Sequence, residues 1–208
     1  MVRIVGCDNR RDMSYIETVP EDEAVGDVAA IYETLHNTLG YLPNYGRQFS
    51  HRPAVYQAWA QLNSAIKSTM DPRRYELATV AAAVRRKSSY CSIAHAEKLL
   101  GLGSSPDELT ALAKAPRSAG LSEEEQAIVD YATKVAGDPA SVDESDVERL
   151  RQAGLSDAEV FDVAATAAAR CFFASLSDAL GTLPDPVFRE RMPNLVDVLA
   201  VGRPVAEK

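Results

Sequence analysis

Three side chains that could act together on a small molecule lie close in the sequence: Glu76, Cys91 and His95. Because Cys91 and His95 are four residues apart, a helix would place them on one face and within reach of each other. A thiol in the first turn of a helix, beside an imidazole and the cations at residues 85–87, is favoured as the nucleophilic thiolate. Glu76 begins an apolar run, where a carboxylate needs a partner, a proton or a chemical purpose. The spacing therefore predicts a Glu–Cys–His site.

Two helices are expected to position these side chains, one from residue 71 to about 86 and one from 88 or 89 to about 100. Asp71 can cap the first helix, and Pro72 suits its first turn, where the missing N–H is not needed. Residues 76–84 are almost all Ala, Val and Leu, which predicts a helix that is buried on nearly all sides. Glycines at 101 and 103 end the second helix.

This pattern resembles the alkylhydroperoxidase D and carboxymuconolactone decarboxylase family, whose redox members carry E-x11-C-x2-C-x3-H across such a helix pair. Glu76, Cys91 and His95 match the Glu, the second Cys and the His, while Ser88 occupies the position of the first Cys. In the peroxidase members the second cysteine is thought to meet the peroxide, and the first resolves it as a disulfide. The resemblance therefore implies that Cys91 is the attacking thiol and that no resolving thiol lies within the site.

Three hypotheses about function follow. In the first, the Cys91 thiolate attacks a hydroperoxide, Glu76 and His95 relay the proton, and an external thiol or redox protein recycles the cysteine. In the second, of the decarboxylase type, Glu76 and His95 act as acid and base on a small carboxylated or enolisable substrate, and Cys91 only lines the pocket. In the third, the protein is a catalytically silent helical scaffold or binding module, and all three residues are structural.

Other residues could support the site or act outside it. Ser88, Tyr90 and His51 are candidates for the substrate pocket or its support; alternatively, His51 is a helix-entry residue that bonds to the backbone. Cys7 is a candidate for a remote resolving thiol, and Cys171 is expected to be a small buried hydrophobic residue.

The sequence predicts neither a metal site nor a cofactor. A structural zinc ion needs four ligands, and Cys91 and His95 supply only two. There is no C-x2-C pair and no glycine-rich phosphate loop.

Composition favours a protein of the cytoplasm. The chain has 208 residues, a net charge of −8 and an isoelectric point near 5.0, which argues against nucleic acid or an anionic membrane as a partner. No apolar run approaches the roughly 20 residues needed to span a bilayer. The first residues lack the apolar core of a secretory signal, and three separated cysteines make no disulfide framework.

The predicted fold class is all-α, an alkylhydroperoxidase D-like bundle of eight to ten helices. Residues 1–19 are expected to form an arm, 20–116 a helical unit that carries the site, and 117–208 a second helical unit with a C-terminal tail, within one integrated domain. Residues 156–181 are taken as a degenerate second copy of the 71–103 unit or as its packing partner. The family resemblance also implies a homo-oligomer, a trimer or a hexamer. On the helix from Pro53 to about Ser68, we expect a buried inner face of Val55, Ala58, Trp59, Leu62 and Ile66.

Overall fold

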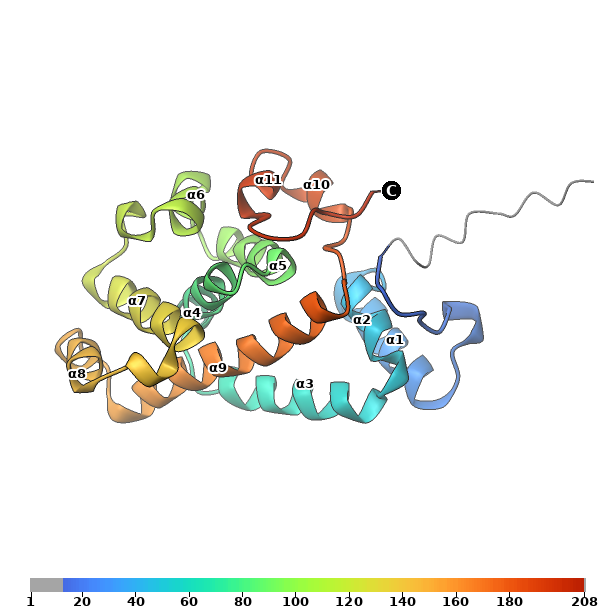
Figure 1. Cartoon of the computed structure of the whole chain (residues 1–208), viewed down its shortest axis with the longest axis horizontal. Helices are drawn as coiled ribbons and strands as arrows, with labels where there is room; N and C mark the ends of the chain where they lie inside the picture. The colour runs from blue at the N-terminus through green and yellow to red at the C-terminus, as the bar shows by residue number, and fades with distance from the viewer. Residues whose placement is uncertain (1–12, 208) are drawn as a thin grey trace, which may run out of the picture.

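A computed structural model describes residues 13–207, in which helices and their connections account for the whole fold and no strand occurs (Figure 1). The all-α fold class is confirmed. Within this range the α-helices are α1 Gly26–Leu39, α2 Asn44–Gln48, α3 Pro53–Lys67, α4 Pro72–Arg85, α5 Ser89–Gly101, α6 Pro106–Lys114, α7 Glu123–Gly137, α8 Glu144–Gln152, α9 Asp157–Ala179, α10 Val187–Arg191 and α11 Val196–Leu199. This is one helix more than the upper limit expected, because the tail after residue 181 forms the short helices α10 and α11.

The helices of the site begin where the sequence signals them. The Asp71 carboxylate accepts hydrogen bonds from the backbone N–H groups of Arg73 and Arg74 at 2.9 and 3.0 Å, and Pro72 is the first residue of α4. Ser88 is the N-cap residue of α5. Further upstream, a short 3₁₀ turn over Glu21–Glu23 precedes α1, which begins at Gly26 with a φ of +56°, a backbone angle that glycine adopts readily.

The core is built around α4, which packs against α5, α7 and α9 (Figure 1). Its residues from Leu77 to Ala83 are all buried, because small Ala and Val side chains let three neighbouring helices approach closely. These contacts reach from the predicted first unit into the predicted second one. The division of the chain at residue 117 stays a prediction about how the chain is organised.

Ion pairs hold the start of α4 against neighbouring helices. Arg73 lies 2.8 Å from Glu108 of α6 and 2.5 Å from Glu125 of α7. Arg74 lies 2.7 Å from Glu124 of α7. Linked, partly buried pairs of this kind fix geometry better than isolated surface pairs do. Since Glu76 follows directly in the same helix, these pairs also fix its position.

The predicted inner face of α3 is only partly buried. Trp59 and Ile66 are buried, but Val55 is 40% and Leu62 is 51% exposed. The reason is that α3 lies along α9 at the edge of the molecule and is not covered on its other side (Figure 1). On α9, Phe161 and Phe172 are also exposed, at 70% and 47%. We call these four residues (Val55, Leu62, Phe161 and Phe172) the exposed apolar residues of α3 and α9.

Helix α9 is long and apolar enough, by length and composition alone, to cross a membrane. In the structure it packs as a core helix against α3, α4, α7 and α8, with Val163, Ala167 and Ala174 buried. After α9 the chain turns back toward α5, where α11 packs against α5 and α6 (Figure 1). The tail therefore covers α5.

Candidate active site

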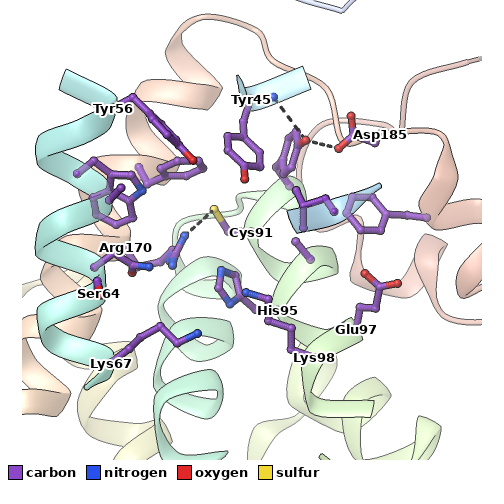
Figure 2. A pocket seen from close by; sticks show the side chains of 18 of the residues that line it. Tyr45, Tyr56, Ser64, Lys67, Cys91, His95, Glu97, Lys98, Arg170 and Asp185 are labelled. Atoms are coloured by element: carbon purple, nitrogen blue, oxygen red, sulfur yellow. Dashed lines mark hydrogen bonds between the residues drawn. The ribbon is translucent and has the colours of Figure 1, made fainter. Parts of the chain in front are cut away.

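A cavity of about 530 Å³ lies between α3, α5, α9 and the segment that follows α9 (Figure 2). Cys91 and His95 both line it. Its walls combine aromatic rings with charged groups. The rings are Tyr41, Tyr45, Tyr56, Trp59, Tyr90, Phe173 and Phe188, and the ionisable groups besides Cys91 and the tyrosines are Lys67, His95, Glu97, Lys98, Arg170, Asp185 and Arg191. A cavity of this size suits a small organic molecule.

Glu76 and His95 form a buried pair across the α4–α5 interface. The Nδ1 atom of His95 lies 2.5 Å from Oε2 of Glu76, and the two residues are 7% and 3% exposed. The Nζ atom of Lys98 lies 3.9 Å from the other carboxylate oxygen. Since Nδ1 is occupied by Glu76, Nε2 is the ring nitrogen left for the pocket.

Burial determines the charge of this pair. Burial and the nearby Arg170 charge lower the pKa of His95 to about 3, and Glu76 only partly offsets them. Burial alone would raise the pKa of Glu76, but His95, Lys98 and Lys67 more than compensate, so this pKa is lowered. At neutral pH the pair is therefore a carboxylate that accepts a hydrogen bond from a neutral imidazole. Such an imidazole has a free lone pair on Nε2, but its lowered pKa makes it a weak base that needs the anion it generates to be stabilised nearby.

Cys91 lies in the first turn of α5, and its sulfur faces a guanidinium group. The Nη1 atom of Arg170, on α9, donates to Sγ at 3.7 Å (Figure 2). The spacing predicted that His95 would be the neighbour of the Cys91 sulfur. Among residues 13–207, the group that donates a hydrogen bond to this sulfur is Arg170 instead, and His95 pairs with Glu76. A positive charge that donates to sulfur favours the thiolate. The cations at residues 85–87, which were expected to do this, are not among the residues that line the cavity.

Arg170 is itself held by aromatic neighbours. It is 4% exposed, its Nη2 atom lies 3.3 Å from the Tyr75 hydroxyl, and its guanidinium lies 5.5 Å from the ring centres of both Trp59 and Phe173. No carboxylate within the described part of the chain forms an ion pair with it. A buried guanidinium without a carboxylate is costly, so its charge is available to Cys91 or to a ligand.

Tyr90 lines the pocket and connects it to the tail. Its hydroxyl donates to Asp185, which also accepts from the Tyr41 hydroxyl at 3.3 Å and from the Asn44 backbone N–H at 2.8 Å. Burial raises the pKa of Asp185, although these three donors partly offset the effect. The bonds join the segment after α9 to α2 and α5, and they complete one wall of the cavity.

The remaining candidates lie outside the cavity. Ser88 is fully buried at the start of α5 and supports the helix that carries Cys91, but it does not line the pocket. His51 is exposed, and its Nε2 atom lies 2.5 Å from the Glu17 carbonyl oxygen, so the pocket alternative is wrong and the backbone-bonding alternative describes it. Cys171 is half-buried, with Sγ 3.9 Å from the Ala136 carbonyl oxygen, and burial raises its pKa. Cys7 lies outside the described residues.

The sequence-based prediction missed six charged groups of the pocket: Lys67, Glu97, Lys98, Arg170, Asp185 and Arg191. One signal was present for Arg170, because it interrupts the Ala-rich run of α9, and a cation in a buried helix usually has a function or a partner. Lys98 follows His95 by three residues, which places it on the same helix face. Lys67 and Asp185 carry no comparable signal. Among residues 13–207, no group of three or more His, Cys, Asp or Glu side chains could hold a metal ion.

Comparison with known proteins agrees with this geometry. Residues 53–134, which include the whole α4–α5 pair, match the model of the carboxymuconolactone decarboxylase family. A search of curated proteins finds no significant match.

Several solved structures share the fold. An alkylhydroperoxidase AhpD core, a peroxidase-related protein from Ralstonia eutropha, superposes with a TM-score of 0.78 at 23% identity over 85% of this chain and 94% of its own. A peroxidase-related protein from Silicibacter sp. TM1040 superposes with a TM-score of 0.77 at 20% identity over 88% and 97% of the two chains. A cysteine-to-alanine variant of the debrominase Bmp8, in complex with 2,3,4-tribromopyrrole, gives a TM-score of 0.70 at 15% identity over 86% and 96%.

Proposed function

Since this chain belongs to the carboxymuconolactone decarboxylase family, we propose that it is a thiol-dependent peroxidase-like oxidoreductase in which Cys91 is the attacking thiolate. The observation that carries the proposal is the contact of Cys91 with the Arg170 guanidinium, in a cavity that is also lined by His95, the partner of Glu76. An inert core cysteine needs neither a buried cation nor a buried base beside it.

The chemistry begins with removal of the thiol proton by Nε2 of His95. Glu76 stabilises the imidazolium that forms, and Arg170 stabilises the thiolate. The thiolate attacks the terminal oxygen of a hydroperoxide ROOH, so that an S–O bond forms as the O–O bond breaks. The leaving RO⁻ takes the proton from His95. The products are ROH and a sulfenic acid on Cys91, and sulfur has been oxidised by two electrons.

Recycling requires two equivalents of an external thiol. The first thiol condenses with the sulfenic acid, which releases water and gives a mixed disulfide on Cys91. The second thiol attacks that disulfide, restores the Cys91 thiol and leaves as the oxidised thiol pair. A small thiol or a redox protein is the proposed reductant, because Ser88 stands where the redox members carry the resolving cysteine.

Mass spectrometry after addition of one equivalent of hydrogen peroxide or cumene hydroperoxide tests the proposal. Cys91 is expected to gain one oxygen and to be trapped by dimedone, whereas Cys171 stays a thiol because it lies outside the cavity. A Cys91→Ser variant is expected to lose peroxide consumption, and a Cys171→Ser variant to keep it. If Cys91 stays reduced under these conditions, the peroxidase proposal is wrong.

A second candidate function is an acid–base lyase, and the neutral His95 beside Glu76 favours it. In that case Nε2 of His95 removes a proton from a small carboxylated or enolisable substrate, and Cys91 is only part of the wall. Turnover of such a substrate by the Cys91→Ser variant, with loss of turnover in His95→Gln, separates this function from the first. Absence of both activities leaves a binding module or scaffold.

The assembly and the cellular location are also proposals. Resemblance to the family suggests a trimer or hexamer, and the exposed apolar residues of α3 and α9 support association. The resemblance to alkylhydroperoxidase-type proteins and the composition of the chain support a cytoplasmic location.

A further inference from the structure

At the end of the cavity where Lys67, Lys98 and Arg170 lie, positive charge exceeds negative charge by one. Lys67, Lys98 and Arg170 are cationic, whereas Glu76 and, on the proposed function, the Cys91 thiolate supply two negative charges. Three cations and two anions leave a net charge of +1. Because Arg170 is buried, its charge attracts a counter-ion more strongly than the charge of an exposed cation would.

The other acidic groups of the cavity already have partners. Glu97 pairs with Arg191 at 3.4 Å, so the two cancel at the rim. Asp185 accepts three hydrogen bonds, from Tyr90, Tyr41 and Asn44, on the side away from Arg170 (Figure 2). Among the described residues, neither group forms an ion pair with Lys67, Lys98 or Arg170, so neither neutralises the charge at that end directly.

One of these cations also has an unused hydrogen-bond donor. The whole Arg170 residue is only 4% exposed, and its buried Nε atom has no hydrogen-bond partner among the described residues. A buried donor without a partner costs free energy, and a ligand oxygen would recover that cost. Arg170 lines the cavity beside Cys91, so an anionic group bound there lies next to the reactive sulfur.

The rest of the cavity is aromatic. Phe173 packs at 5.2 Å from the Trp59 ring centre and at 5.3 Å from that of Tyr45, with interplanar angles of 36° and 71°. Rings arranged at mixed angles present both faces and edges to a flat ligand. A cavity of about 530 Å³ is also far larger than hydrogen peroxide requires. The aromatic wall and the cationic end together suit a ligand that has a flat apolar body and one negative charge.

We propose that this pocket binds a monoanionic aromatic acid, with its carboxylate at Lys67, Lys98 and Arg170 and its ring against Trp59 and Phe173. The substrate class for the Cys91 chemistry is then a hydroperoxide of an aryl-substituted organic acid, rather than hydrogen peroxide itself. The inference rests on the proposed function only for the negative charge of Cys91. The arrangement of the binding residues does not depend on whether the protein turns over a peroxide.

Intrinsic fluorescence tests this directly, because Trp59 is the single tryptophan of the chain and lies in the wall. The probes are 3-phenylpropionate, the neutral 3-phenylpropionamide and the aliphatic anion hexanoate, each titrated into the intact protein. We expect 3-phenylpropionate to bind about tenfold more tightly than either probe, since the amide lacks the charge and hexanoate lacks the ring. Equal affinity for acid and amide would overturn the proposal.

Lysine variants locate the anionic group. Lys67→Met and Lys98→Met should each weaken binding of 3-phenylpropionate about fivefold or more while changing amide binding less than about twofold, because only the acid loses a counter-charge. Lys114→Met, an exposed change on α6 outside the cavity, is the matched control. Retention of full acid affinity in both pocket variants would contradict the proposed site. Lys67 is included because Lys98 also contacts Glu76 and could alter the pair.

Failure of this inference can be told apart from failure of the proposed function. Peroxide oxidation of Cys91 is measured without any acid present, so it does not depend on ligand binding. Oxidation of Cys91 without binding of 3-phenylpropionate would overturn the ligand class alone. Binding of 3-phenylpropionate to a protein whose Cys91 resists peroxide would overturn the peroxidase proposal and support the pocket as an aromatic-acid site.

Discussion

The Nη1 atom of Arg170 lies 3.7 Å from Sγ of Cys91, although 79 residues separate them in the chain. Tyr75 bonds the same guanidinium, and Trp59 and Phe173 flank it. The positive charge next to the sulfur is therefore supplied by α9 rather than by the residues adjacent to Cys91 in sequence. This arrangement makes Arg170 the first residue to test.

Replacement of Arg170 by Gln should slow alkylation of Cys91 by iodoacetamide at pH 7 about tenfold or more, because a neutral amide stabilises a thiolate less than a guanidinium does. The rate is measured by mass spectrometry of the Cys91 peptide. Arg86→Gln is the control, since Arg86 is exposed and bonds to Ser175 at 3.2 Å instead. Equal rates in the Arg170→Gln variant and the parent protein would show that this cation does not activate the thiol.

Replacement of Glu76 by Gln should slow peroxide turnover by roughly 10²-fold or more with the fold intact, the usual scale for loss of acid–base catalysis. The amide cannot stabilise an imidazolium at His95, so the proton transfer becomes unfavourable. Turnover and melting temperature are measured on the same sample. A lowered melting temperature with unchanged Cys91 reactivity would instead make Glu76 a purely structural acid.

Replacement of Ser88 by Cys should create an internal resolving thiol, because residues 88 and 91 lie one turn apart at the start of α5. A sulfenic acid condenses with the nearest thiol, and serine offers none. Peroxide treatment of the variant should give a disulfide to Cys91 and loss of two titratable thiols. The parent protein should stop at sulfenic acid, over-oxidise or form a mixed disulfide. Mass spectrometry of both after one equivalent of peroxide distinguishes these products.

The stability of the fold should fall as the pH drops below about 6.5. The pKa of His95 is about 3 in the fold and about 6.5 when unfolded, so between these values the unfolded chain binds the extra proton. The full stability is present above the unfolded pKa of about 6.5. It is lost as the pH falls toward the folded pKa of about 3, by up to about 1.4 kcal/mol per pH unit. The lowered pKa of Glu76 adds a loss of the same sign at lower pH.

Urea unfolding midpoints between pH 7 and 4.5 measure this dependence. His95→Asn should flatten it, because the titrating group is removed. His51→Asn should leave it in place, since His51 is exposed and bonded to backbone. An unchanged slope in the His95 variant would contradict a neutral buried imidazole.

The protein is expected to be a homo-oligomer at micromolar concentration, because Leu62 and Phe161 expose large apolar side chains on adjacent helices. Leu62→Glu or Phe161→Glu should lower the mass measured by light scattering. Leu102→Glu, at an exposed apolar position at the end of α5, is the matched control and should leave the mass unchanged. A monomeric parent protein would rule out the association.

Local signals in the sequence were sufficient for the helix pair and for three residues of the site. Capping by Asp71, the Ala-rich run of α4 and the Cys91–His95 spacing all act within a few residues, and the structure has each of these features. The contact that pairs Glu76 with His95 links adjacent helices and was implied by the family pattern.

The contacts that could not be predicted from the sequence depend on packing between segments that are far apart in the chain. Arg170 reaches Cys91 only because α9 lies beside α4, and Asp185 reaches Tyr90 only because the chain reverses after α9. Helix periodicity says which side of a helix is apolar, but it does not say whether another helix covers that side. Val55 and Leu62 were assigned to the inner face of α3 for this reason, although only Trp59 and Ile66 on that helix are buried.

The separation of these partners along the sequence also sets the order in which they are synthesised. A ribosome makes Cys91 well before Arg170, which follows 79 residues later, and Tyr90 precedes its partner Asp185 by 95 residues. A nascent chain that already exposes the thiol therefore has neither the guanidinium that favours the thiolate nor the wall that encloses it. On the proposed function, the nucleophile is therefore complete only in a chain in which α9 has been made and has packed against α4.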